Sequence, residues 1–344
     1  MLRVKGLEVS HVPVIVVGAS LGGVEAIRFL AGRLPADLAA AVFVVLHIGA
    51  HKSELPWLLN QLGPLHANHA GDGDPIHPGQ IYVAPPDHHL VIEPGHMRLT
   101  RGPRENWARP AIDPLFRSAA RAYGPDVIGV ILTGGLNDGT AGLFEIEQRN
   151  GTTVVQHPDD AANPSMPLSA LKHVVVDHCL PLAQIPALLA KLVAERNASA
   201  LLNETQPASA AEWSREMTAE YKLDQPVAVT CPDCGGALRR IELGTLTQFA
   251  CHIGHIYTAE VVVAAQFAAM EWSLGAAMRS LSERGELCRQ MAEKAQAAGE
   301  APVALQWERA MREAKERTAG LRQLLEDKWM HPGDVDTPPP LSGG

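Results

Sequence analysis

Residues 13–23 read PVIVVGASLGG, and this stretch decides the fold. Its first half is a short, unbroken apolar run, which is typical of a β-strand buried on both faces in a parallel sheet. Glycines then mark a sharp turn, and residues 24–34 (VEAIRFLAGRL) carry apolar side chains at helical spacing. The stretch therefore predicts a strand, a turn and a helix, which is the opening unit of an α/β fold.

The same alternation of strands and helices continues to about residue 196. Apolar runs predict strands over 41–46, 81–85, 127–132, 152–156 and 173–177, with an extended hairpin over 89–100. Helical spacing predicts helices over 53–62, 113–123, 140–150 and 181–196. We therefore expect residues 1–196 to form an α/β domain with a doubly wound, mainly parallel sheet and helices on both faces.

The pattern changes after residue 196. Residues 197–226 are small, polar and aperiodic, which predicts a linker. Residues 227–258 hold a cluster of cysteines and histidines, and residues 259–330 are rich in Ala, Glu, Arg and Leu. We expect the latter to form a helical hairpin that turns near Ala298, followed by a disordered tail over 331–344.

Composition limits the kinds of function. The chain has 344 residues, of which 46% are hydrophobic, and this predicts two domains. A formal net charge of −9 argues against a nucleic-acid partner held by a broad basic surface. Neither a signal peptide nor a membrane span is expected, because no sustained apolar segment is long enough. Five cysteines, three of them within 21 positions, favour metal binding and a reducing cytoplasm.

Residues 18–22 (GASLG) match the G-x-S-x-G pattern between a predicted strand and a predicted helix. A sharp turn there raises the Ser20 hydroxyl above the carboxyl edge of the sheet, as in a nucleophile. The N–H of Leu21, at the start of the helix, is the first candidate donor to an oxyanion. The alternative is a phosphate-binding turn in which Ser20 caps the helix, but neither a G-x-G-x-x-G pattern nor a Walker lysine accompanies it.

A serine nucleophile needs a base and a carboxylate that orients the base. His47 closes the strand over 41–46, and Asp138 follows the strand over 127–132 in the loop TGGLNDG. Both therefore project onto the same sheet edge as Ser20. Two simpler roles stay open: His47 as an exposed loop residue, and Asp138 as the cap of a helix that begins at Thr140.

Four segments, GASLGGVEAI, VVLHI, RPAIDPLFRSAA and ILTGGLNDGTAGL, occur in the order and spacing of a known family. Over about residues 11–195 the chain resembles the catalytic domain of the chemotaxis protein-glutamate methylesterases, the CheB family. The resemblance implies a triad of Ser20, His47 and Asp138 that needs no cofactor for catalysis. It also implies a methylated chemoreceptor as partner, so that contact with membranes is only peripheral. Hydrolysis of glutamate γ-methyl esters, with release of methanol, would be the main activity, and deamidation of glutamines the second.

The chain departs from the family pattern at several places. The usual loop reads T-G-M-G-x-D-G, with a methionine at the oxyanion site, where this chain has Gly135 and then Leu136. A backbone N–H at Gly135 can still serve there, and Leu21 stands where the family often has threonine. The first strand begins near residue 13, which leaves no room for the receiver domain that usually precedes. We therefore expect a stand-alone relative without phosphorylation gating in cis.

Two further polar residues lie in RPAIDPLFRSAA. Asp113, before a proline at a helix start, is most simply an N-cap. Arg117, one turn later, either grips an acidic segment of the substrate or pairs with Asp113.

The Cys/His cluster has the spacing of a structural zinc site. A C-x₂-C pair is followed by a C-x₃-H pair, and the predicted ligands are Cys231, Cys234, Cys251 and His255. His252, adjacent to Cys251, would strain the chelate. Four protein ligands leave no open position for water, so the zinc is expected to stabilise a small zinc ribbon over 227–258. Helices rather than basic residues flank this ribbon, which favours docking or dimer formation over nucleic-acid binding.

The helical region offers an apolar stripe. Its expected members on the first helix are Val262, Ala265, Ala269, Trp272, Ala276 and Leu281, and on the second Leu305, Ala310, Leu321 and Leu324. The two helices can bury these stripes against each other. The pair can also pack across a two-fold axis as a homodimer, or dock on the α/β domain near Ser20. The main alternative to an esterase is a catalytically silent signalling scaffold whose ribbon and helices carry the binding.

Overall fold

The computed structural model of this chain describes residues 12–47, 53–202 and 226–327. It divides into two compact units, Met1–Val261 and Val262–Gly344. The tail expected over 331–344 lies outside the described residues, as does most of the predicted linker.

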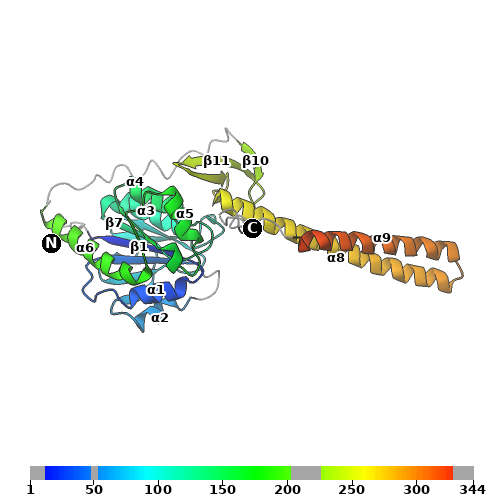
Figure 1. The fold of residues 1–344 in the computed structure, drawn as a ribbon, viewed down its shortest axis with the longest axis horizontal. Coiled ribbons are helices and arrows are strands. Elements are labelled where there is room, and N and C mark those ends of the chain that lie inside the picture. The colour runs from blue at the N-terminus through cyan, green and yellow to red at the C-terminus, as the bar shows by residue number, and fades with distance from the viewer. Residues whose placement is uncertain (1–11, 48–52, 203–225, 328–344) are drawn as a thin grey trace, which may run out of the picture. The chain divides into compact units, whose positions relative to one another are not determined.

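A sheet that contains β1 and β7 forms the centre of the first unit (Figure 1). It has seven strands in the order β3-β4-β2-β1-β7-β8-β9. Its strands are β1 (Val14–Ala19), β2 (Ala41–Leu46), β3 (His66–His69), β4 (Gln80–Val83), β7 (Val127–Ile131), β8 (Thr152–Gln156) and β9 (His178–Leu180). Each described pairing in this sheet is parallel. The carboxyl ends of β1, β2 and β7 are in register, with Gly18 opposite both Val45 and Ile131.

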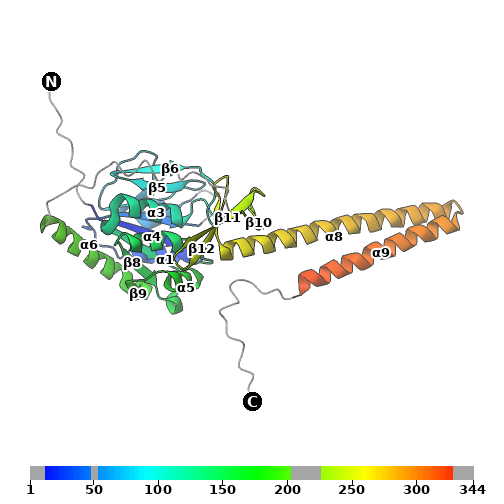
Figure 2. The ribbon, with the colours of Figure 1, turned by 90° about the horizontal axis from the view of Figure 1, so that it is seen from above.

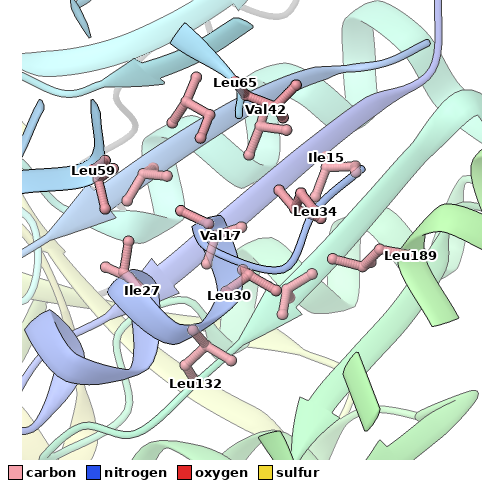
Figure 3. Packing of buried hydrophobic residues seen from close by; sticks show 14 of the residues in the cluster. Ile15, Val17, Ile27, Leu30, Leu34, Val42, Leu59, Leu65, Leu132 and Leu189 are labelled. Carbon is pink, nitrogen blue, oxygen red and sulfur yellow. The ribbon is translucent and has the colours of Figure 1, made fainter. Parts of the chain in front are cut away.

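Helices cover both faces of the sheet. One face carries α1 (Gly23–Ala31), α2 (Leu55–Asn60) and α6 (Ile185–Leu202), and the other α3 (Ile112–Tyr123), α4 (Thr140–Gln148) and α5 (Ser165–His173). Successive residues of β1 serve opposite faces, because side chains alternate along a strand. Figure 3 shows Ile15 and Val17 beside Ile27, Leu30 and Leu189 on the first face. Burial of each such side chain contributes about 1.5–3 kcal/mol to the stability of the folded state. The predicted doubly wound α/β fold is confirmed.

An antiparallel hairpin of β5 (His89–Glu93) and β6 (His96–Thr100) adds to the second face. Leu90, Ile92 and Met97 join the core cluster that also holds Phe116 of α3. The hairpin turns at Gly95, whose φ of 80° favours glycine.

The last strand of the sheet differs from our prediction. The strand expected over 173–177 is wrong: α5 continues to His173, and β9 begins only at His178. Asp177 explains the shift, because its carboxylate accepts hydrogen bonds from both the N–H and the hydroxyl of Thr153 at 2.8 and 2.9 Å. This segment is therefore held through side chains rather than through a β-ladder. α6 also continues to Leu202, beyond the expected end of the domain.

A second, antiparallel sheet belongs to the same compact unit. Its four strands are β10 (Pro226–Thr230), β11 (Ala237–Leu243), β12 (Leu246–Cys251) and β13 (Ile256–Thr258). We call these strands and their connections the ribbon.

Two long helices form the C-terminal hairpin, as predicted: α8 (Ala259–Ala297) and α9 (Ala301–Glu326) (Figure 2). The turn contains Gly299 with a φ of 76°. Part of the expected apolar stripe is wrong, since Trp272 is 75% exposed and Leu305 and Leu324 are each 45% exposed, whereas Val262 and Ala265 are buried as expected. Further along the hairpin the buried side chains are small and include Cys288, Ala292, Ala295, Ala304 and Ala314. Two helices alone bury only a narrow seam, and small side chains let their axes approach closely.

Among the described helices, α8 is long and apolar enough to cross a membrane by length and composition alone. A single helix of this kind is weak evidence for a membrane span.

Candidate active site

Ser20 lies directly after the central strand β1, at the carboxyl edge of the sheet. Its N–H donates to the carbonyl of Thr133 at 3.0 Å, and its own carbonyl accepts from Gly23 N–H at 2.8 Å. Gly22 has a φ of 78°, and a Cβ there would lie 2.6 Å from the Cβ of Ala162. The chain thus makes a tight turn that only glycine accommodates, and this turn places Ser20 ahead of α1.

His47 and Asp138 come from the two strands that flank β1. His47 N–H donates to the carbonyl of Ala19 at 3.2 Å, which aligns the ends of β1 and β2. The His47 Nδ1 atom lies 3.2 Å from Ser20 Oγ, and its Nε2 atom lies 2.8 Å from Asp138 Oδ2. With Nε2 donating to the carboxylate, Nδ1 keeps a lone pair for the serine hydroxyl. The structure therefore brings together the three residues that strand-end positions had selected.

Asp138 is held in a dense set of donors. Only 3% of its surface is exposed. Besides His47, it accepts from Ile112 N–H at 2.6 Å, Gly139 N–H at 3.0 Å and Asn106 Nδ2 at 2.9 Å. Burial acts to raise the pKa of Asp138, but the hydrogen bond and charge of His47, followed by the donors from Ile112 and Asn106, lower it below its usual value. These donors therefore favour the ionised form of Asp138.

Asp113 differs from our expectation. It is the second residue of α3 and not its N-cap, which is Ala111. Its fully buried carboxyl group accepts from Gly142 N–H at 2.7 Å and from Asn106 Nδ2 at 2.9 Å. Burial and the nearby charge of Asp138 raise the pKa of Asp113 well above its usual value. The two carboxyl groups are thus driven apart in pKa, which favours negative charge on Asp138.

Arg117 pairs with Glu105 rather than with Asp113. Its guanidinium donates to both carboxylate oxygens of Glu105, at 2.7 and 2.9 Å. Burial acts to lower the pKa of Arg117, but Glu105 more than offsets this effect and raises it. The charge of Arg117 is therefore compensated within the protein, not presented to an acidic substrate.

Two backbone N–H groups near Ser20 are available as oxyanion donors. Among the described residues, the N–H groups of Leu21 and Gly135 have no acceptor. Gly134 packs closely on the nucleophile, since a Cβ at this position would lie 2.9 Å from the Cβ of Ser20. Leu136, in the same loop as Gly134, is 40% exposed, and Leu21 is 65% exposed.

The ribbon carries a second cluster, at the positions expected for metal ligands. One ligand atom from each of four residues lies within 4.8 Å of all the others, from Cys231, Cys234, Cys251 and His255. Nδ1 of His255 lies 3.6 Å from Cys231 Sγ and 3.4 Å from Cys251 Sγ. The Sγ atoms of Cys234 and Cys251 are 3.7 Å apart. Such separations fit three thiolates and one imidazole around a single tetrahedral ion.

Outer groups support this cluster. His255 Nε2 lies 3.9 Å from Asp233 Oδ2, and the Tyr257 hydroxyl donates to the same oxygen at 2.7 Å. A carboxylate beside the free nitrogen of a ligating histidine is the usual way to fix its ring. His252 lies outside the group of four ligand atoms.

Three residues near the site were not predicted from the sequence: Asn106, Asn137 and Thr258. Thr258 of β13 donates through its N–H to Asn106 Oδ1 at 3.1 Å, and through its hydroxyl to Asn137 Oδ1 at 2.6 Å. All three side chains are buried. No local motif reveals these bonds, because Thr258 is 152 residues from Asn106 and 121 residues from Asn137.

Comparison with known proteins relates about half of the chain to one family. The family described as CheB methylesterase matches residues 15–189. A relative from Leptospira interrogans is 39% identical over 181 residues, which cover 52% of this chain and 93% of the relative. A protein of Anaeromyxobacter dehalogenans named protein-glutamate methylesterase/protein-glutamine glutaminase 2 is also 39% identical, over 53% of this chain and 54% of its own length.

A solved structure is similar as well. The CheB methylesterase catalytic domain of Thermotoga maritima superposes with a TM-score of 0.51 and 31% identity, covering 52% of this chain and 98% of that domain. The matched family region ends before the ribbon and the helical hairpin begin. A family match over about half of the chain, together with the shared fold, leads to one conclusion: the chain belongs to the CheB methylesterase family.

Proposed function

We propose that this chain is a serine hydrolase that removes methyl groups from glutamate γ-methyl esters of a chemoreceptor-like signalling protein. The observation that carries the proposal is the hydrogen-bonded series from Ser20 Oγ through His47 to the buried carboxylate of Asp138. The names of the curated relatives point to the same reaction and to deamidation of glutamine as a second one.

Each step follows from the position of these groups. Ser20 Oγ attacks the ester carbonyl carbon while His47 Nδ1 takes the hydroxyl proton. The oxyanion of the tetrahedral intermediate accepts from the N–H groups of Leu21 and Gly135. His47 then returns the proton to the departing methoxide, and methanol leaves. Water, deprotonated by His47, then attacks the carbonyl carbon of the acyl-serine. The bond from this carbon to Ser20 Oγ breaks, His47 returns the proton to Oγ, and the glutamate carboxylate is released.

Asp138 keeps the histidine ready for both proton transfers. Its carboxylate accepts from His47 Nε2, which fixes the tautomer that leaves Nδ1 free for Ser20. The same carboxylate stabilises the imidazolium that forms when His47 takes the serine proton. None of these steps needs a cofactor, and a glutamine side chain would react in the same way with ammonia as the leaving group.

We assign zinc to the cluster of three cysteines and His255. Thiolate and imidazole ligands in tetrahedral arrangement are the donor set that zinc prefers. With all four positions taken by the protein, the ion stabilises the ribbon and takes no part in ester hydrolysis.

The proposed setting is the cytoplasm, where reduced thiolates persist and receptor signalling domains are accessible. The partner is a methylated receptor, so contact with the membrane is indirect and nucleic acid is not involved. We also propose a homodimer through the C-terminal helices, because Val263 and Trp272 of α8 are 50% and 75% exposed.

Methanol release from a receptor fragment that carries glutamate γ-methyl esters tests the proposal. We expect the full chain to release methanol and Ser20→Ala to lose activity by about four orders of magnitude or more, because the triad acts as a unit. Ser199→Ala, an exposed serine on α6, is the matched control and should keep the wild-type rate. A wild-type chain that releases no methanol, or a Ser20→Ala variant with more than a few per cent of the rate, would contradict the assignment.

A further inference from the structure

Asn106 lies between the triad carboxylate and the ribbon. The residue is buried, with 6% of its surface exposed, and its backbone φ is 48°. Asn106 Nδ2 donates to Asp138 Oδ1 at 2.9 Å and to Asp113 Oδ2 at 2.9 Å. Both amide hydrogens are therefore used by the two buried carboxyl groups.

The ribbon holds this residue through its last strand. Asn106 N–H donates to the carbonyl of Ile256 at 2.8 Å, and Thr258 N–H donates to Asn106 Oδ1 at 3.1 Å. A backbone N–H can only donate, so Oδ1 must face β13 and Nδ2 must face Asp138. The ribbon thereby determines which end of the Asn106 amide meets the carboxylate.

The ribbon also reaches the residue that precedes Asp138. Thr258 Oγ1 donates to Asn137 Oδ1 at 2.6 Å, and Asn137 Nδ2 donates to Glu260 Oε2 at 2.8 Å. Asn137 is only 2% exposed, so these bonds form away from competing water. Asp138 is consequently held from both its side chain and its backbone neighbour.

The metal cluster lies next to these contacts in the chain. His255 immediately precedes Ile256, and its carbonyl accepts from Cys251 N–H at 3.0 Å. His255, the fourth proposed ligand, therefore directly precedes β13 and fixes the position at which this strand begins.

From these contacts we propose that Asn106 is a positioning residue for the triad, and that β13 of the ribbon holds it in place. The proposal rests on the proposed function, because it takes Asp138 to be the carboxylate of the catalytic triad. Without the Asn106 donor, Asp138 Oδ1 loses a charge-assisted hydrogen bond and the carboxylate can rotate away from His47 Nε2. The ribbon is thus part of the catalytic architecture.

The test uses full-length chains with three changes. Asn106→Asp keeps the shape of the side chain and an acceptor for Thr258 N–H, but replaces the donor to Asp138 with an oxygen. Thr258→Val removes the bond to Asn137 only. Thr245→Val is the matched control, because its hydroxyl contacts His173 of α5 at 2.9 Å instead of the loop that carries Asp138.

Three measurements separate positioning from folding. They are kcat and KM for methanol release, the rate at which a fluorophosphonate labels Ser20, and the downfield proton NMR signal of His47 Nε2–H. We expect Asn106→Asp to lower kcat and the labelling rate by about 10- to 100-fold, the effect of losing one hydrogen bond to a charged group, with KM unchanged. The His47 signal should shift or disappear. Thr258→Val should change all three in the same direction but less, and Thr245→Val should change none.

An Asn106→Asp chain that labels within twofold of wild type, with an unchanged His47 signal, would overturn the inference. Equal effects of Thr245→Val and Thr258→Val would also overturn it. The lower activity would then follow from any weakened contact between the ribbon and the α/β part, and not from the contact near Asp138. If Asn106→Asp does not fold, Asn106→Ala and Thr258→Val provide the same comparison. Labelling does not depend on the methyl ester, so a wild-type chain that labels at Ser20 but releases no methanol would refute the proposed function and leave this inference testable.

Discussion

Two adjacent glycines in the loop before Asp138 have different surroundings. A Cβ on Gly134 would lie 2.0 Å from Met166 Sδ and 2.9 Å from Ser20 Cβ, whereas a Cβ on Gly135 would meet only Asn163 Nδ2 at 3.9 Å. Met166 is itself fully buried, so neither neighbour of Gly134 can move away easily. The close approach of Gly134 thus sets the position of the nucleophile.

We predict that Gly134→Ala lowers ester hydrolysis by about tenfold or more and destabilises the fold by about 1–3 kcal/mol, the usual cost of overpacking. Gly135→Ala is the matched control and should stay close to wild type in both respects. Initial rates and chemical unfolding of the two variants are the measurements. Similar losses for both alanines would show that the crowding at Gly134 is not what matters.

At the scale of single elements, the apolar runs located the central strands because burial on both faces requires apolar residues throughout. The segment His66–His69 (HANH) forms the edge strand β3, which among the described strands pairs with β4 alone, and it contains no run of apolar residues. α5 was also missed, because Pro164 and Pro167 interrupt the helical pattern at its start. Elements whose stability depends on their neighbours do not show in a local pattern.

The ribbon gives a prediction at the same scale. Freshly purified wild-type chain should contain one zinc per chain by elemental analysis, and Cys251→Ser should lose it, because three ligands bind zinc far more weakly than four. His252→Ala, which changes the residue next to Cys251, should retain the metal. Wild-type chain without zinc, or metal loss from His252→Ala instead, would contradict the ligand set.

At the scale of the whole molecule, sequence reasoning worked for residues at the ends of strands and failed for contacts between distant segments. Ser20, His47 and Asp138 each follow a strand of one parallel sheet, so topology alone places them at one edge. The bond between Thr258 and Asn106 depends on how the ribbon packs on the α/β unit, which no periodicity encodes. The predicted apolar stripe on α8 and α9 was partly wrong because it also depends on contacts between distant segments. Many of the side chains buried there are small.

The division of the chain at Val261 leads to a further prediction. A shortened chain that ends there keeps the sheet, the ribbon and every contact of Asp138 described above, so it should fold and hydrolyse the ester at the wild-type rate. We expect light scattering to give the mass of a monomer for this shortened chain and of a dimer for the full chain. Trp272→Glu should shift the full chain toward monomer, because the side chain is exposed on α8. Equal mass per chain in both forms would refute the dimer.

The amide of Asn106 also limits how this enzyme can be recombined. The family matches residues 15–189, yet in the part of the chain that the structure describes, Asn106 Oδ1 and Asn137 Oδ1 accept their hydrogen bonds from Thr258 alone. A gene fusion that contains residues 15–189 alone would keep both buried amides but lack Thr258, which donates hydrogen bonds to them. A chimaera built from this chain should therefore extend through residue 261.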